Sequence, residues 1–446
     1  MKIIGLIAEY NPFHNGHLEQ LKQIQERYGE RLGLIAVMSG DWTQRAGLAV
    51  LDKWDRARLA TAAGINLVLE LPTLFATGNG QCFASGAVHL LAATGLVKNI
   101  CCGAETEQPK FLHTAADLML NEPPELSLHL QTAFKNGMNP GAAWENAIKA
   151  YMQSIPENDI DRSADQDKQA FPPDLLTGSN NWLAIEYIKA AKSLGNAGPR
   201  ITILRRRGQA YLDDQATGES TGKLLSATAV RTALYHLFGY PTESSNWNTE
   251  LWNKLCHSLP DYTAGTLLRA GLNKTMGFNE QIGPYILATL LAVPKSYLTT
   301  LAGFSTDFSN RLIKTANQLV DLPPTAVWQQ LIEAVTSRNF TAAHTIRSLT
   351  ALALGITQKQ RDLAIQEGPQ YIRVLAFDKT GRYLLRRMRD RSRLPIITKE
   401  SDFLEYNHLG TVFAQQYKTD IKASRIRRLL TGQGPGNNFD TRVHVR

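Results

Sequence analysis

Four predominantly apolar runs in the first 110 residues constrain the fold most strongly. Stretches with helical spacing of apolar residues separate them, as in HLEQLKQIQERYG between the first run and the second. Apolar runs that alternate with helices are typical of parallel strands covered by helices on both faces. The sequence therefore predicts an α/β fold built on a parallel sheet. The runs read KIIGLIAEY (2–10), LGLIAVMSG (32–40), NLVLELP (66–72) and VKNICCGAE (97–105).

The rest of the chain follows three further patterns. A helix (NWLAIEYIKAAKSLG), a strand (RITILRR) and a helix (SATAVRTALYHLFG) continue the α/β pattern, and residues 250–365 are almost wholly helical by pattern. The last part combines a strand (YIRVLAF), a basic helix (GRYLLRRMRDRS) and a strand (LPIIT). We therefore expect three parts, with the boundaries 1–240, 241–368 and 369–446.

The positive charge of the chain is concentrated at its C-terminal end. Residues 371–446 contain 16 Lys and Arg against 7 Asp and Glu, a net charge of +9. The preceding 370 residues carry 32 against 33, a net charge of −1. Such an asymmetry indicates a polyanionic partner that binds the C-terminal end.

Cysteine usage and the N-terminus indicate a cytoplasmic protein. The four cysteines show no CxxC spacing, and Cys101 and Cys102 lie in a predicted buried strand, so we expect reduced thiols. Glu9 and Asn11 interrupt the first apolar run before a signal peptide develops. No apolar run is long enough to cross a bilayer, so we expect no membrane partner.

The turn AEYNPFHNGH follows the first predicted strand, at the sheet edge where ligands of parallel sheets bind. Pro12 suits a tight exit from a strand, and Gly16 allows close approach of a ligand. A helix that begins near His17 offers free N–H groups to an anion, and the imidazoles of His14 and His17 add hydrogen-bond donors. These features suit a triphosphate. A metal site would need a third ligand that the sequence does not offer nearby, and two surface histidines are the simpler alternative.

A second segment, SATAVR, begins a predicted helix late in the α/β pattern. Ser226 or Thr228 is suited to cap this helix, and Arg231 is placed to reach a phosphate over the first turn. On its own the segment is equally typical of an ordinary helix start.

The His-x-Gly-His turn and the Ser-x-Thr-x-x-Arg helix start together resemble the nucleotidyltransferase superfamily, whose members attack ATP at the α-phosphate and release pyrophosphate. Further blocks resemble, in order, the tRNA(Met) cytidine acetate ligase family and cover nearly the whole chain. This resemblance implies a Rossmann-like nucleotidyltransferase domain that binds ATP at 1–240, a helical domain at 241–368 and a tRNA-binding α/β region at 369–446. The blocks are GLIAEYNPFHNGH, AVMSGDWTQRAGLAVLDKWDRARLATAAGINLVLELP, CGAE, SNNWLAIEYIKAA, LRRRGQAYLDD, LLSATAVR and DKTGRYLLRRMRDRSRLPIIT.

The resemblance also implies a reaction. Enzymes of this family use ATP to activate acetate as acetyl-adenylate, and then transfer the acetyl group to the wobble cytidine of elongator tRNA(Met), forming N4-acetylcytidine. The implied co-substrate is ATP, with Mg²⁺ bridging phosphate oxygens, and the implied partners are acetate and elongator tRNA(Met). His14 and His17 are the expected catalytic residues, because they are placed to stabilise the charge that develops on the phosphates.

The ATP site implied by the resemblance combines the opening turn with three later positions and the SATAVR helix. The register leaves Asn180 open beside Asn181, and Arg205 and Arg207 open beside Arg206. The expected ATP-binding residues are Ile7, Ala8, Glu9, Tyr10, Asn11, Pro12, Phe13, His14, Asn15, Gly16, His17, Leu18, Glu19, Gln20, Gly103, Asn181, Arg206, Ser226, Thr228 and Arg231.

Two further groups of residues are candidates for other contacts. Gln44 and Arg45 follow the second strand, where a second substrate is expected, whereas Lys53 and Arg56 are more typical of a solvated helix face. Arginines crowd the predicted helix near residue 386, which indicates contact with an RNA backbone rather than a merely solvated face. The expected tRNA-binding residues are Arg382, Arg386, Arg387, Arg389, Arg391 and Arg393.

Two other functions share parts of this pattern. An adenylyltransferase that makes a dinucleotide cofactor would share both phosphate motifs, but it would need neither the helical region nor the basic tail. A non-catalytic RNA-binding protein with a relic nucleotide site would share the tail.

Overall fold

The computed structural model describes residues 1–45, 47–138, 140–154, 175–176, 178–206, 225–239, 247–338, 340–399, 401–406, 408, 410–433 and 443–446. Within these residues, eight strands form one sheet with the order β10-β8-β5-β2-β1-β6-β7, and β9 pairs with β8. The strands from β5 to β7 in this order are parallel, as the sequence predicts. They are β1 (Lys2–Ala8), β2 (Leu32–Ser39), β5 (Leu67–Leu71), β6 (Asn99–Ala104) and β7 (Arg200–Arg205).

The C-terminal strands extend this sheet and do not form a second one. Strand β8 (Ile372–Phe377) pairs antiparallel with β5, so that Leu67 lies opposite Phe377. Strands β9 (Ile396–Ile397) and β10 (His444–Val445) pair parallel with β8. The predicted elements of the C-terminal region are therefore confirmed, and they are integrated into the sheet that carries the opening turn.

Alternate residues of the strands pack against two different layers of helices, as expected for a buried parallel sheet. Leu34 and Ala36 of β2 face a core formed with α1 (Asn15–Tyr28), α2 (Lys53–Ala62), α9 (Ala227–Phe238), α10 (Thr249–Cys256) and α11 (Asp261–Leu272). Ile35 and Val37 face the opposite core, which includes α3 (Thr73–Ala76), α4 (Gly80–Ala93), α8 (Ser179–Ser193) and α18 (Lys379–Arg389).

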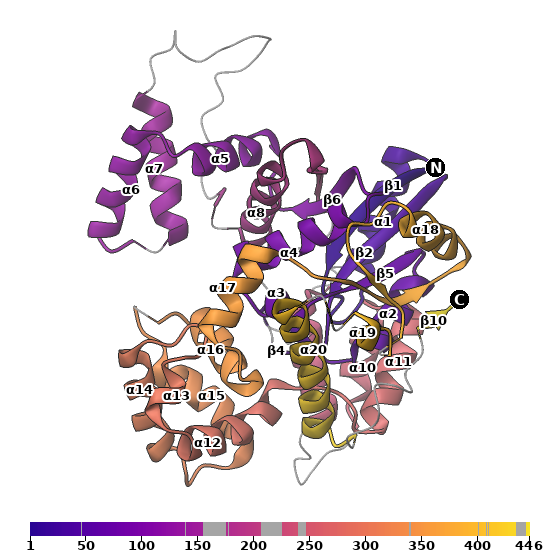
Figure 1. Cartoon of the computed structure of the whole chain (residues 1–446). Helices are drawn as coiled ribbons and strands as arrows, with labels where there is room; N and C mark the ends of the chain where they lie inside the picture. The colour runs from indigo at the N-terminus through magenta and orange to yellow at the C-terminus, as the bar shows by residue number, and fades with distance from the viewer. Residues whose placement is uncertain are drawn as a thin grey trace.

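Two helical groups project from this α/β body (Figure 1). One follows β6 and consists of α5 (Lys110–Asn121), α6 (Pro124–Lys135) and α7 (Pro140–Ser154). The other confirms the helical pattern predicted for residues 250–365; it contains η2 (Asn279–Gln281), α12 (Ile282–Ala292), α13 (Lys295–Leu298), α14 (Thr306–Gln318), α15 (Pro324–Val335), α16 (Ala342–Leu354) and α17 (Gln358–Glu367). The remaining short elements are β3 (Trp42–Thr43), β4 (Gly47–Leu48), η1 (Gly195–Ala197) and α19 (Asp402–Glu405).

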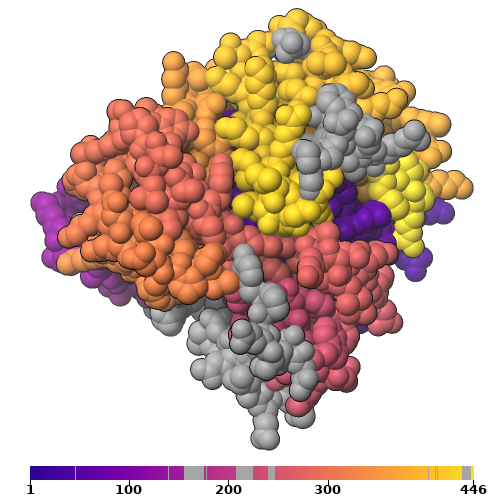
Figure 2. Space-filling model, turned by 90° about the horizontal axis from the view of Figure 1, so that it is seen from below, coloured from indigo at the N-terminus to yellow at the C-terminus, as the bar shows by residue number. Residues whose placement is uncertain are grey.

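Helix α20 (Thr411–Leu430) joins the C-terminal part to the other two parts. Figure 2 shows its yellow surface against the orange surface of the helical group, where Lys422 Nζ donates to the carbonyl of Leu354 at 3.0 Å. On the sheet side, the indole of Trp42 donates to the carbonyl of Ala423 at 3.0 Å. The predicted parts 1–240, 241–368 and 369–446 thus share buried contacts. Their independence as folding units stays a prediction.

Candidate active site

The opening turn is anchored firmly between β1 and α1. Tyr10 adopts a left-handed φ of 47°, the Asn11–Pro12 peptide bond is cis, and the ring of Phe13 is fully buried. The side chain of Asn11 accepts a hydrogen bond from the backbone N–H of Val50 at 2.8 Å. The backbone N–H of Asn15 donates to the carbonyl of Ser258 at 3.0 Å. The turn is therefore held from outside, which leaves its polar side chains free for a ligand.

The two histidines cap α1 reciprocally. The backbone N–H of Gly16 donates to Nδ1 of His14 at 3.0 Å, and the backbone N–H of His14 donates to Nδ1 of His17 at 3.2 Å. The two rings lie with their centroids 3.9 Å apart. A neutral imidazole whose Nδ1 accepts must carry its proton on Nε2. Both histidines therefore present an Nε2–H donor, and neither Nε2 has a hydrogen-bond partner among the described residues.

Burial keeps both imidazoles neutral before a ligand binds. Burial, together with the cations Arg206 and Arg231, lowers the pKa of His14 from its usual 6.5 to about 3. The pKa of His17 is also well below its usual value, because the ring is buried and lies beside His14 and Arg206. At neutral pH the pair thus acts through hydrogen bonds and does not carry fixed positive charge.

The late helix start lies directly against this turn. Arg231 of α9 donates through Nη1 to the carbonyl of Asn11 at 3.1 Å and through Nη2 to Oγ1 of Thr228 at 3.0 Å. Ser226 accepts from the N–H of Ala229 at 3.1 Å and so acts as the N-cap of α9. Segments more than 200 residues apart in sequence therefore meet at one point, with a guanidinium beside two imidazole donors.

The ends of β6 and β7 form the third wall. A Cβ atom on Gly103 would lie 3.1 Å from Cγ of Arg206, so the glycine makes room for this arginine at the strand end. Asn180, at the start of α8, lines the cavity. Asn181 is buried, and its side chain accepts from the N–H groups of Glu105 and Thr106 at 2.8 and 3.2 Å. In this structure Asn180 faces the ligand space and Asn181 supports the loop behind it.

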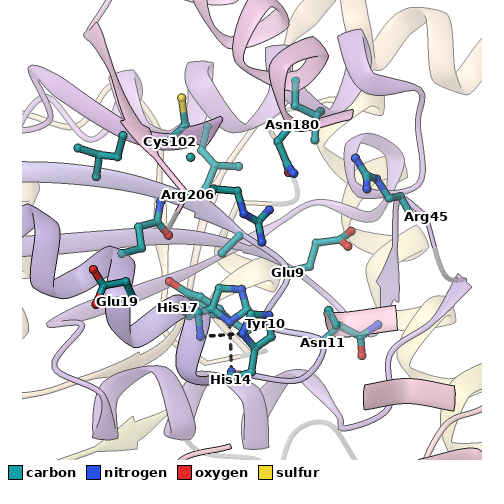
Figure 3. Close-up of a pocket in the computed structure, with 18 of the residues that line it drawn as sticks. Glu9, Tyr10, Asn11, His14, His17, Glu19, Arg45, Cys102, Asn180 and Arg206 are labelled. Carbon is teal, nitrogen blue, oxygen red and sulfur yellow. Dashed lines mark hydrogen bonds between the residues drawn. The ribbon is translucent and has the colours of Figure 1, made fainter. Parts of the chain in front are cut away.

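The cavity brings together most of the expected ATP-binding residues (Figure 3). Arg205 lines it beside Arg206, and Arg207 lies outside the described residues. Pro12, Phe13, Asn15, Leu18, Asn181 and Ser226 support the turn, the capping contacts or the core and do not line the cavity. The expected residues that do line it are Ile7, Ala8, Glu9, Tyr10, Asn11, His14, Gly16, His17, Glu19, Gln20, Gly103, Arg206, Thr228 and Arg231.

Gln44 and Arg45 line the same cavity from the turn between β3 and β4. The backbone N–H of Gln44 donates to Oε1 of Glu9 at 2.7 Å, which ties this turn to the opening turn. Beneath it, Asp41 accepts from the hydroxyl of Ser424 on α20 at 2.7 Å. The place expected for a second substrate is therefore continuous with the nucleotide site.

The expectation of a solvated face for Lys53 and Arg56 is wrong, because both side chains are fully buried. Lys53 Nζ forms an ion pair with Glu70 at 2.8 Å. Arg56 donates to the carbonyls of Glu9 at 2.7 Å, Ser39 at 3.0 Å and Leu51 at 3.1 Å, and also to that of Gly40. Strands that end at the ligand edge leave carbonyls without sheet partners, and a guanidinium satisfies several of them at once. Helical spacing alone did not indicate this role.

Several cavity residues were not predicted from sequence. Gln23, Phe83, Cys102, Leu183 and Tyr187 also line the space, and they come from α1, α4, β6 and α8. Burial raises the pKa of Tyr187, so its phenol stays protonated as a hydrogen-bond donor. These residues have the pattern of ordinary core positions, which no local motif distinguishes.

The basic helix α18 packs on the sheet through one face and exposes the other. Gly381, Leu384 and Met388 are buried against the sheet. Five of the six expected tRNA-binding arginines are exposed and Arg387 is half-buried beside the ring of Tyr383. The exposed arginines are Arg382, Arg386, Arg389, Arg391 and Arg393.

Two absences are restricted to the described part of the chain. There, no group of three or more His, Cys, Asp and Glu side chains is arranged to hold a metal ion. No described helix combines the length and apolar composition that a membrane span requires. The four cysteines are free thiols, and three of them are buried.

The comparison with known proteins defines the class first. The profile of the HIGH nucleotidyl transferase family matches residues 1–440, so the chain belongs to that family. Within this class it belongs to the tRNA(Met) cytidine acetate ligases. It is 30% identical over 407 residues to the tRNA(Met) cytidine acetate ligase of Acetivibrio thermocellus, covering 91% of this chain and 90% of that protein. It is 32% identical over 428 residues to that of Thermotoga petrophila, covering 94% and 93%.

A solved structure agrees with this assignment. Thermotoga maritima TmcAL bound with alpha-thio ATP superposes with a TM-score of 0.82 at 28% sequence identity. The match covers 100% of this chain and 99% of that one. The expected fold class is therefore confirmed over the whole chain.

Proposed function

We propose that this protein is an ATP-dependent ligase that activates acetate as acetyl-adenylate and transfers the acetyl group to the wobble cytidine of elongator tRNA(Met). The product is N4-acetylcytidine, with AMP and pyrophosphate released. One observation carries the proposal: Arg231 bonds the backbone of the turn that bears His14 and His17, so both phosphate-binding elements face one cavity. The names of the relatives and the ATP analogue in the T. maritima structure support it.

The first step needs charge stabilisation at the phosphates. An acetate oxygen attacks the α-phosphorus and the bond to the β-phosphate breaks, so that charge accumulates on the departing pyrophosphate. The Nε2–H groups of His14 and His17 and the guanidinium of Arg231 are the donors that the cavity offers to these oxygens. Arg206 lies on the opposite wall and adds a second cation.

Acetate and Mg²⁺ are the parts of this proposal that depend most on chemistry. Gln44 and Arg45 lie at the end of the cavity away from Arg206, and a guanidinium suits a carboxylate. The described residues offer carboxylates but no three-ligand cluster, which fits a Mg²⁺ ion that enters on the phosphate oxygens and keeps most of its waters. When bound, the ion would neutralise phosphate charge.

The exposed arginines of α18 are the proposed tRNA contacts. Guanidinium groups on one helix face match a phosphodiester backbone. A cytoplasmic location follows from the proposed substrate and remains part of the proposal.

The test is an incubation with ATP, acetate and tRNA. We expect AMP and pyrophosphate to form only when acetate is present, and one cytidine of elongator tRNA(Met) to gain the mass of an acetyl group. Formation of a dinucleotide would favour the cofactor-making alternative. Binding of tRNA without turnover of ATP would favour the non-catalytic one.

A further inference from the structure

We propose that Glu9 is the general base of the acetyl-transfer step, the group that takes the proton from the exocyclic N4 amine of cytidine. The proposal rests on the proposed function and deepens it. The family resemblance places Glu9 in the ATP-binding segment as a whole and gives it no such role.

The chemistry of the step requires a proton acceptor. The N4 nitrogen attacks the carbonyl carbon of acetyl-adenylate and forms the new C–N bond. The bond from that carbon to the phosphate oxygen then breaks, and AMP leaves with the electron pair. The nitrogen must lose one of its two protons to give the neutral amide. A group positioned to accept this proton accelerates such a reaction.

The histidines are not suited to this task. Nδ1 of His14 accepts from Gly16 and Nδ1 of His17 accepts from His14, so each ring carries its proton on Nε2. An Nε2–H group donates and cannot accept a proton. The same geometry that suits the pair to stabilise phosphate oxygens therefore excludes it as the base.

Glu9 is positioned rigidly with one oxygen open. Its backbone carbonyl accepts from Nη1 of the buried Arg56 at 2.7 Å. Its Oε1 accepts from the N–H of Gln44 at 2.7 Å, and Oε2 has no hydrogen-bond or ion-pair partner among the described residues. Figure 3 shows the carboxylate between the histidine pair and Arg45, directed into the cavity. An immobilised carboxylate with a free oxygen is the arrangement a base requires.

Electrostatics also argue against a role in binding ATP alone. A carboxylate repels a triphosphate, so a residue that served only the nucleotide would be neutral or positive here. Glu9 acts electrostatically on Arg231, which places it near the phosphate end of the cavity. Among the described residues, the other acidic side chain that lines the space is Glu19, which accepts from Gln23 at 3.2 Å. Glu19 lies on the side of His17 away from Arg45 (Figure 3).

The test compares two partial reactions of the full-length variant Glu9→Gln. Acetate-dependent ATP–pyrophosphate exchange measures adenylate formation, and single-turnover transfer to tRNA measures the second step. Glutamine keeps an acceptor for the N–H of Gln44 but cannot take up the proton. We expect the variant to lower transfer at least about 100-fold more than it lowers exchange. The matched variant Glu19→Gln should change the two reactions by the same factor.

The pH dependence supplies a second readout. Transfer by the wild-type protein should slow at low pH as the carboxylate becomes protonated, and Glu9→Asp should keep this acidic limb. Glu9→Gln should lose it. Equal losses in exchange and transfer, or an acidic limb that survives in Glu9→Gln, would overturn the assignment of Glu9 alone. Absence of acetate-dependent exchange in the wild-type protein would instead contradict the proposed function, and this inference with it.

Discussion

The buried guanidinium of Arg56 should be a major source of local stability at the ligand edge of the sheet. We expect Arg56→Met to destabilise the ends of β1 and β2, because it removes the donor for the carbonyls of Glu9, Ser39, Gly40 and Leu51. Each buried carbonyl left without a donor costs ~1–3 kcal/mol, offset partly by the lost desolvation penalty of the cation. The net loss should be about 4 kcal/mol, within the ~3–5 kcal/mol typical of breaking one side of a buried charge network.

Amide hydrogen exchange is the suitable assay, because a chain of this size does not unfold in one step. A loss of about 4 kcal/mol corresponds to a roughly thousandfold faster exchange of the protected amides near Ala8 and Ser39. Arg58→Met is the matched control on the same helix. The Arg58 side chain is 49% exposed and pairs with Asp55, so its loss should change exchange less than about threefold. Protection in Arg56→Met within tenfold of the wild-type protein would refute this reasoning.

Three other predictions concern the proposed ATP and tRNA contacts. Replacing His14 and His17 together by alanine should lower acetate-dependent ATP–pyrophosphate exchange by at least about 100-fold, since two phosphate donors are lost, and full retention would exclude their assigned role. Because burial lowers the pKa of His14 to about 3, the unfolded chain binds a proton between about pH 6.5 and 3 that the folded protein excludes. The free energy of unfolding without ATP should therefore fall as the pH decreases through this window, by up to ~1.4 kcal/mol per pH unit from this group, and a denaturation series with His14→Gln should show a shallower fall. Reversing the charges of Arg382, Arg386 and Arg389 to glutamate should weaken tRNA binding and reduce its salt dependence by up to about 0.9 in logarithmic slope for each phosphate contact, whereas the lysine variants should retain both; unchanged binding by the glutamate variants would exclude α18 as the contact.

The elements of the fold that depend on local pattern could be predicted from sequence. The runs at 2–10 and 32–40 became adjacent parallel strands, and the predicted basic helix is α18. The order of the sheet could not be predicted, because the antiparallel pairing of β8 with β5 joins residues about 300 positions apart. Nothing in the run YIRVLAF indicates which strand it will pair with.

The site divides in a similar way. The histidine turn and Arg231 belong to motifs with fixed spacing, so the expected cradle could be derived from the sequence. Whether Asn180 or its neighbour faces the cavity depends on the rotation of α8, which periodicity does not define to one residue. Arg56 has the spacing of a surface position, and its burial follows from carbonyls at the ends of strands far away in sequence.

A structure of this protein with a non-hydrolysable ATP analogue and acetate tests the central claim most directly. We predict that oxygens of the triphosphate lie within hydrogen-bond distance of Nε2 of both His14 and His17 and of the guanidinium of Arg231, with acetate toward Arg45. A triphosphate bound elsewhere, or imidazoles that contact only protein atoms in that complex, would contradict the account.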